Sequence, residues 1–150
     1  MVGYLHPGSP EPYASQVDAF KKGLRETGYT EGVNLAFEFA WAHNEFDRLS
    51  ALAARLISRR VNVIVATAGA AALAAKAATS SIPIVFNSSV SPVQIGLVAS
   101  LNRPGGNLTG SPICTSSLDP SGLASYARSF RVPHALRRWS IPMARMRTFL

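Results

Sequence analysis

The chain has 150 residues, of which 47% are hydrophobic and 15% charged, so it can bury one core, and a single domain is expected. No stretch approaches the ~20 continuous apolar residues that span a bilayer, and no signal peptide precedes Val2. As written, the sequence therefore predicts a cytoplasmic protein without a membrane span.

The positive charge is concentrated in the last 40 residues. The net charge is +7, but residues 1–110 hold 9 Lys and Arg against 7 Asp and Glu, whereas residues 111–150 hold 6 Arg against Asp119 alone. The first segment is nearly neutral, which argues against nucleic-acid binding. Cys114 is the only cysteine, which excludes an intrachain disulfide, a CxxC motif and a zinc cluster.

The first third of the chain alternates strand and helix patterns. Residues 2–5 are an apolar run that ends in a turn rich in Pro and Gly, which predicts a buried strand. Apolar residues then recur with helical spacing until Gly28, which suits a left-handed helix cap. Residues 35–41 alternate large apolar side chains with Ala and Glu, which predicts a strand at the edge of a sheet.

The same alternation continues to residue 100. A β-branched run and a second apolar run predict two more strands, while helical periodicity, an Ala-rich run and a Ser-Pro start predict three more helices. The predicted elements are a helix at 46–59, a central strand at 61–66, a helix at 70–78, a strand at 82–86 and a helix at 91–100.

Strands that alternate with helices at these lengths predict an α/β fold, a doubly wound parallel sheet with right-handed crossovers. Such a sheet binds ligands beside the carboxyl ends of its strands, where the strand order reverses. Trp41 ends the second predicted strand, where its ring either faces a ligand or belongs to the core. The loops that follow the four strands are residues 6–12, 41–44, 67–71 and 87–91.

These loops are rich in hydroxyl and amide groups and poor in ionisable ones, which favours binding over catalysis. The backbone N–H groups after Gly69 and after Ser91 can hold a carboxylate or phosphate, although Thr67 and Ser91 can also merely cap helices. GxGxxG, GxxxxGK[ST] and GxSxG motifs are absent. His6 and His43 come without a placed carboxylate, so no catalytic residue, metal site or cofactor is expected.

Six segments of the first 110 residues carry a family resemblance. They are GSPEPY at 8–13, GLRETGYTEGVN at 23–34, FDRLSALAA at 46–54, AALAAKAAT at 71–79, IPIVF at 82–86 and GLVASLNRPGGNLTG at 96–110. In this order, and almost without gaps, they resemble the ABC transporter substrate-binding family associated with tryptophan and tyrosine uptake.

The resemblance implies the type I periplasmic-binding-protein fold, in which two lobes close on a small ligand, and it implies that this chain is the N-terminal lobe. Residues 101–110 would lead toward the first hinge crossing. A polar or amino-acid-like ligand, an aromatic amino acid among them, is implied, as is an ABC permease that serves a periplasmic or lipid-anchored parent protein. By position, the ligand-binding residues would be Ser9, Pro10, Thr67, Ala68, Gly69, Ala70, Asn87, Ser88 and Ser89.

Residues 111–150 show no sustained period, which predicts an irregular basic tail. Synonymous codons for the tail can be chosen so that a shifted frame spells a helix, a strand and a turn that look like the start of the family's second lobe. We therefore expect a frameshift near Gly110 and a truncated protein that binds its ligand weakly, because one lobe leaves the ligand wet. A disordered extension and a basic segment that binds nucleic acid or acidic membrane are the alternatives.

Two other functions remain open. An effector-binding lobe of a transcription regulator shares this fold, although no helix-turn-helix precedes the first strand. A small flavodoxin-like or nucleotide-binding enzyme would need a phosphate loop or an acid–base pair that the sequence lacks. The sequence thus favours a non-enzymatic, solute-binding component of an ABC importer.

Overall fold

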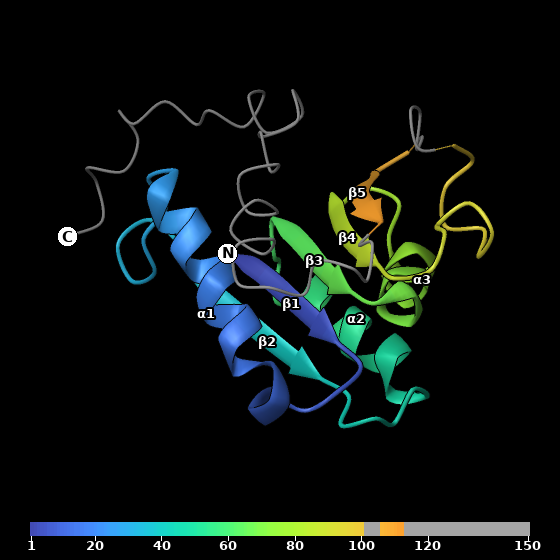
Figure 1. Ribbon diagram of the computed structural model, residues 1–150, viewed down its shortest axis with the longest axis horizontal. Coiled ribbons are helices and arrows are strands. Elements are labelled where there is room, and N and C mark those ends of the chain that lie inside the picture. The colour runs from blue at the N-terminus through green and yellow to red at the C-terminus, as the bar shows by residue number, and fades with distance from the viewer. Residues whose placement is uncertain (101–105, 113–150) are drawn as a thin grey trace.

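The computed structural model describes residues 1–100 and 106–112. Its elements are β1 (Val2–His6), α1 (Pro10–Glu26), β2 (Phe37–Trp41), α2 (Arg48–Ser58), β3 (Val63–Thr67), α3 (Gly69–Ala78), β4 (Ile84–Ser88) and β5 (Leu108–Pro112). The five strands form one parallel sheet in the order β2-β1-β3-β4-β5. Helix α1 covers one face, and α2 and α3 cover the other (Figure 1). This arrangement confirms the predicted α/β fold with a doubly wound parallel sheet.

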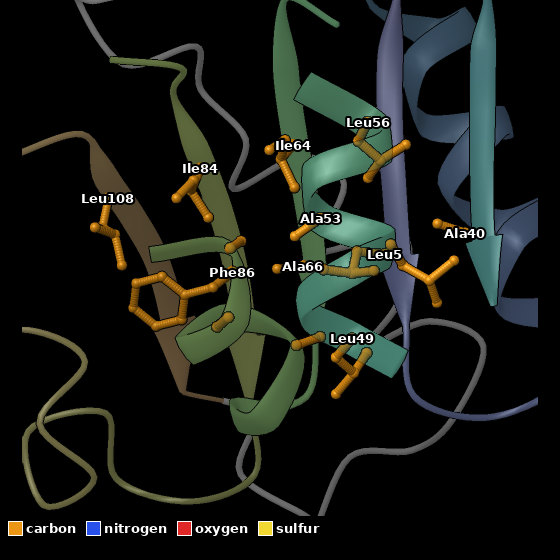
Figure 2. Close-up of a cluster of buried hydrophobic side chains, with 14 of the residues drawn as sticks. Leu5, Ala40, Leu49, Ala53, Leu56, Ile64, Ala66, Ile84, Phe86 and Leu108 are labelled. Carbon is orange, nitrogen blue, oxygen red and sulfur yellow. The ribbon is translucent and has the colours of Figure 1, made fainter. Parts of the chain in front are cut away.

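The larger core lies between the sheet and the pair α2 and α3. Leu5, Ile64 and Phe86 project from three neighbouring strands into it, and all three are almost fully buried (Figure 2). Small side chains of α3, among them Ala72 and Ala75, are also fully buried, so this helix packs closely. The strands and the two helices on this face therefore share one closely packed core.

The opposite face is an aromatic layer beneath α1. Phe37, Phe39 and Trp41 follow one another along β2, with neighbouring ring centroids 5.6 and 6.3 Å apart. Tyr4 of β1 contacts both Phe39 and Trp41 at 5.6 Å. The Lys21 ammonium of α1 lies 5.3 Å from the centroids of Phe37 and Phe39, which is within cation–π range. Helix α1 is thus fixed over β1 and β2.

The predicted cap of the first helix is confirmed. Gly28 has φ +92°, its N–H donates to the Arg25 carbonyl at 3.0 Å, and the Tyr29 N–H donates to the Leu24 carbonyl at 2.9 Å. These two bonds satisfy carbonyl groups that the helix end leaves open, as in a Schellman motif. The other shared elements begin and end within a few residues of their predicted bounds.

The helix predicted over residues 91–100 is wrong. A single turn follows Pro92 and ends at Gly96, whose φ of +70° leaves the helical region. The Leu97 and Val98 N–H groups both donate to the Pro92 carbonyl, at 2.8 and 3.2 Å. Leu97 and Val98 then lie buried in the core, outside any helix.

Strand β5 was not predicted from the sequence. Leu108 lies opposite Ile84 and Gly110 opposite Phe86 in a parallel pair with β4. Its residues, LTGSP, show little of the β-branched alternation that is typical of a strand. The extended conformation of this segment therefore depends on its hydrogen bonds to β4. The strand continues to Pro112, past the predicted start of the tail at residue 111. Residues 113–150 lie outside the described part, so their irregular, basic character stays a prediction.

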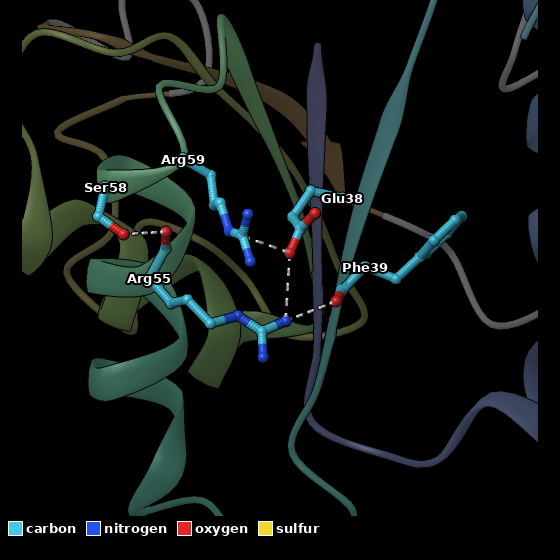
Figure 3. A network of polar contacts seen from close by, with 5 residues as sticks. All are labelled: Glu38, Phe39, Arg55, Ser58 and Arg59. Carbon is cyan, nitrogen blue, oxygen red and sulfur yellow. Dashed lines mark hydrogen bonds and ion pairs between the residues drawn. The ribbon is translucent and has the colours of Figure 1, made fainter. Parts of the chain in front are cut away.

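Strand β2 lies at one edge of the sheet, as predicted, and α2 covers part of its open side. The Ala36 carbonyl and the Ala42 N–H bond to β1, so the intervening Phe39 carbonyl points away from the sheet. The Arg55 guanidinium donates to this carbonyl at 2.9 Å and lies 3.6 Å from the Glu38 carboxylate (Figure 3). The contact blocks one acceptor that another strand could otherwise pair with.

Replacing Gly110 with Ala is expected to destabilise the fold, because the added Cβ would overlap the Phe86 carbonyl oxygen and lie 2.8 Å from its ring. We expect the free energy of unfolding to fall by about 2–3 kcal/mol in urea titrations. Thr109→Ala in the same strand is the control. Equal effects of the two substitutions would show that Gly110 is not required by close packing.

Replacing Arg55 with Met is expected to lower the free energy of unfolding by about 1 kcal/mol, because the Phe39 carbonyl loses its charged donor. Arg59→Met is the matched control, since the Arg59 guanidinium lies 4.0 Å from the same Glu38 oxygen. Chemical denaturation of both variants measures the difference, and an Arg59 effect as large as that of Arg55 would contradict the assignment.

Candidate functional site

The strand order reverses between β1 and β3. From β1 the chain continues to β2 on one side, whereas from β3 it continues to β4 on the other side. The loops after β1 and β3 therefore diverge, and this reversal is where doubly wound sheets of this order bind ligands. All of the strands are parallel, so the loops after β1, β2, β3 and β4 meet at this edge.

The loops after β1 and β2 are joined by hydrogen bonds. The Asn44 N–H donates to the Pro7 carbonyl at 2.7 Å, and the His43 N–H donates to the Gly8 carbonyl at 3.1 Å. His43 Nδ1 also lies 3.1 Å from the Ser9 hydroxyl. His43 and Asn44 adopt φ values of +53° and +66°, which non-glycine residues rarely do. The two loops thus form one platform with a constrained backbone.

The turn between β3 and α3 is also constrained. Ala68 has φ +74° and ψ +152°, a region that is essentially restricted to glycine. Its N–H donates to Asn87 Oδ1 at 3.1 Å, across the β3–β4 pair in which Thr67 lies opposite Asn87. Residues in rare backbone conformations cluster at functional sites, and three such residues in the described part lie at this edge.

Two of the expected ligand-binding side chains form hydrogen bonds with the backbone. The buried Thr67 hydroxyl donates to the Leu5 carbonyl at 3.1 Å and caps no helix. The Ser88 hydroxyl, almost fully buried, donates to the Val90 carbonyl at 2.8 Å and accepts the Val90 N–H at 3.2 Å. Ser89 is exposed beside them. Ligand contact by any of these residues stays a prediction.

The two helices that begin at this edge differ in the donors that they offer. Helix α1 starts with Pro10 and also contains Pro12, which have no N–H, and Glu11 adds a negative charge to its first turn. Helix α3 starts with Gly69, Ala70 and Ala71, whose N–H groups have no partner within the helix, and it has neither an acidic first turn nor a side-chain cap. The start of α3 therefore suits an anion better.

His6 lies within an aromatic cluster. From the sequence it was a poor candidate for metal binding or acid–base chemistry. Its ring centroid is 4.0 Å from that of Tyr13 and 5.1 Å from that of Trp41. The Gly8 N–H donates to His6 Nδ1 at 2.8 Å, so the neutral ring carries its proton on Nε2. Burial lowers the pKa of His6 to about 4. The ring is therefore neutral at pH 7, and Trp41 is half-buried beside it.

No group of three or more His, Cys, Asp or Glu residues that could hold a metal ion occurs within residues 1–100 and 106–112. Among the same residues, no helix is long and apolar enough to cross a bilayer.

The low pKa of His6 predicts a dependence of stability on pH. His6 binds a proton more easily in the unfolded chain, where its pKa is near the usual value of about 6.5. The stabilisation that the neutral ring contributes is therefore fully present above pH 6.5 and decreases as the pH falls toward 4. We expect a loss of about 2 kcal/mol between pH 7.5 and 5 from this group. Urea titrations at several pH values should show that the free energy of unfolding depends less on pH in His6→Phe, with exposed His43→Phe as the control. An equal dependence on pH in all three proteins would contradict the assignment.

Comparison with known proteins agrees with this architecture. A sequence profile of the family described as ABC transporter substrate binding protein matches residues 6–114. A tyrosine-binding protein from Clostridioides difficile is 37% identical over 91 residues, which are 61% of this chain and 26% of that protein. The chain thus spans about a quarter of the length of this relative.

Several solved structures also resemble this chain. A substrate-binding protein with adhesive properties from Clostridium difficile, ligand-free and open, superposes with a TM-score of 0.64 at 29% identity, covering 73% of this chain and 36% of that chain. A conserved domain protein from Vibrio cholerae gives 0.65 at 31% identity, with the same coverage of 73% and 36%. A Streptococcus pneumoniae ABC domain in complex with L-Trp shares the fold, with a TM-score of 0.66 at 24% identity over 75% of this chain and 37% of that chain.

The parallel sheet, its carboxyl-edge loops and the family match over most of the sequence lead to one conclusion. The chain belongs to the family of ABC transporter substrate-binding proteins.

Proposed function

We propose that this chain supplies one wall of a cleft that binds an aromatic amino acid for uptake by an ABC importer. The observation that carries the proposal is the start of α3 at the strand-order reversal. The N–H groups of its first three residues are backbone donors, and the first turn of this helix contains no acidic residue. An amino-acid carboxylate fits such a position, because it gains both hydrogen bonds and the favourable helix dipole.

The aromatic cluster at the same edge supports an aromatic side chain on the ligand. Trp41 is half-buried at the end of β2, and its neighbour His6 is neutral at pH 7, so this part of the edge offers rings without charge. Ring-to-ring contacts of this kind favour a flat apolar group. One relative is described as a tyrosine-binding protein and another structure holds L-Trp, which agrees with this ligand class.

The predicted contacts divide into two groups. Gly69 and Ala70 supply backbone donors, while Ser9 and Ser89 supply polar side chains at the rim of the site. The other expected residues shape the loops that carry these groups: Thr67, Ser88, Pro10, Ala68 and Asn87.

The chain acts by binding alone in this proposal, without a catalytic residue, and its partner is the permease that receives the ligand from the whole binding protein. A periplasmic or lipid-anchored location of the whole protein follows from that role. A second lobe completes the cleft, because one wall leaves most of the ligand in contact with water.

Titration of the ¹⁵N-labelled 150-residue chain with L-tryptophan tests the proposal. We expect the amide resonances of Gly69, Ala70 and Ser89 to shift, with a dissociation constant of about 1 mM or weaker, since a single wall excludes little water. Tryptamine, which lacks the carboxylate, should leave Gly69 and Ala70 unchanged. L-lysine serves as the control for general amino-acid effects.

A single substitution tests the backbone N–H of Ala70 by itself. Ala70→Pro removes one N–H at a position in the first turn where a helix tolerates proline, so the fold should persist. Its affinity for L-tryptophan should fall about tenfold, the loss expected for one hydrogen bond to a charged group. Unchanged affinity in a folded Ala70→Pro protein, or resonance shifts scattered away from this edge, would refute carboxylate binding at α3.

A further inference from the structure

We propose that Asn87 is a positioning residue, which holds the backbone of Ala68 in a left-handed conformation and thereby fixes the direction of the first turn of α3. The carboxamide acts through Ala68, by a single hydrogen bond between the ends of neighbouring strands. This role differs from the direct ligand contact that the family resemblance implies for Asn87.

The first observation is the conformation of Ala68 itself. Its φ of +74° and ψ of +152° bring the Cβ of an L-residue into conflict with the backbone, so glycine would be the ordinary occupant. An alanine remains there only when surrounding contacts hold it. One of these contacts is the 3.1 Å bond from the Ala68 N–H to Asn87 Oδ1.

The second observation is that Asn87 is itself fixed. It lies opposite Thr67 in the parallel pair of β3 and β4, so the main-chain ladder determines its place. The next residue, Ser88, is almost fully buried and is bonded through its hydroxyl to both backbone groups of Val90. The acceptor offered to Ala68 therefore belongs to a rigid part of the edge.

The third observation is the close packing beyond the turn. A Cβ at Gly69 would lie 2.9 Å from Ile95 Cδ1 and 3.4 Å from the Ser88 hydroxyl, so α3 begins against the segment that follows β4. The Ala68 carbonyl accepts the Ala72 N–H at 3.1 Å, which is the first bond of the helix. The two peptide groups of Ala68 are thus held from opposite sides, one by Asn87 and the other by α3.

The consequence for ligand binding rests on the proposed function. Rotation of the peptide groups around Ala68 would turn the N–H groups of Gly69 and Ala70 away from the direction in which they meet a carboxylate. Binding energy is lost when such donors must be reoriented on each encounter, so a pre-set turn favours affinity. Asn87 would supply this order without touching the ligand.

Thermal unfolding tests the strain at Ala68. Ala68→Gly should raise the midpoint by about 2 °C or more, because relief of strain exceeds the added entropy of the unfolded chain. Ala54→Gly, at an exposed position within α2, is the matched control and should lower the midpoint by about 4 °C. Equal losses in the two variants would overturn the strain at Ala68 and the inference with it.

Amide hydrogen exchange without ligand tests the role of Asn87. Asn87→Ala should speed exchange at Ala68 by at least about tenfold and move the resonances of Ala70 and Ala72, because the turn relaxes. Asn87→Asp keeps an acceptor and should preserve both signals. Adding Ala68→Gly to Asn87→Ala should restore the Ala70 and Ala72 resonances, since glycine adopts the turn unaided. Failure of this rescue, or slow exchange in Asn87→Ala, would overturn the inference.

L-tryptophan titrations of the same proteins separate the two proposals. Absence of binding to the unmodified chain would refute the proposed function and leave the exchange results to decide the role of Asn87. If the double variant regains the native α3 resonances but not the affinity for L-tryptophan, Asn87 contacts the ligand directly, and a purely positioning role is refuted. Recovery of both supports it.

Discussion

The parallel pairing of β1 with β2 on one side and with β3 on the other is the constraint on which the rest of the structure depends. It brings the carboxyl ends of the strands to one edge and makes the strand order reverse there. It also separates two apolar layers, an aliphatic one under α2 and α3 and an aromatic one under α1. The site is therefore a product of sheet topology, and its residues are distant in sequence.

The chemistry of this edge is mainly that of the backbone. Thr67 and Ser88 use their hydroxyl groups to hold the strands and loops in place, and Asn87 uses its carbonyl oxygen to hold Ala68. The groups left for a ligand are amide N–H groups and rim side chains, which suit binding rather than proton transfer. Constrained turns at His43 and Ala68 keep these groups in fixed directions, as expected of a site that recognises a small molecule.

Local sequence patterns predicted much of this fold, and their failures have physical reasons. Gly28 was expected to cap the first helix, and it adopts the required positive φ, because that signal depends on one residue and its own turn. The helix expected over residues 91–100 is only a single turn, because Gly96 leaves the helical region and the Leu97 and Val98 N–H groups bond back to the Pro92 carbonyl. Strand β5 was not predicted because its residues have a low preference for strands, and the segment is extended through its pairing with β4.

By itself, the sequence determined the alternation of strands and helices, the edge position of β2 and the polarity of the loops, because periodicity and turn chemistry are local properties of the chain. Tertiary structure alone decided the order of the strands and the burial of His6 among aromatic rings. It also placed the Thr67 hydroxyl on the Leu5 carbonyl and the Ala68 N–H on Asn87 Oδ1. These features depend on contacts between residues far apart in the chain, and no local pattern records them.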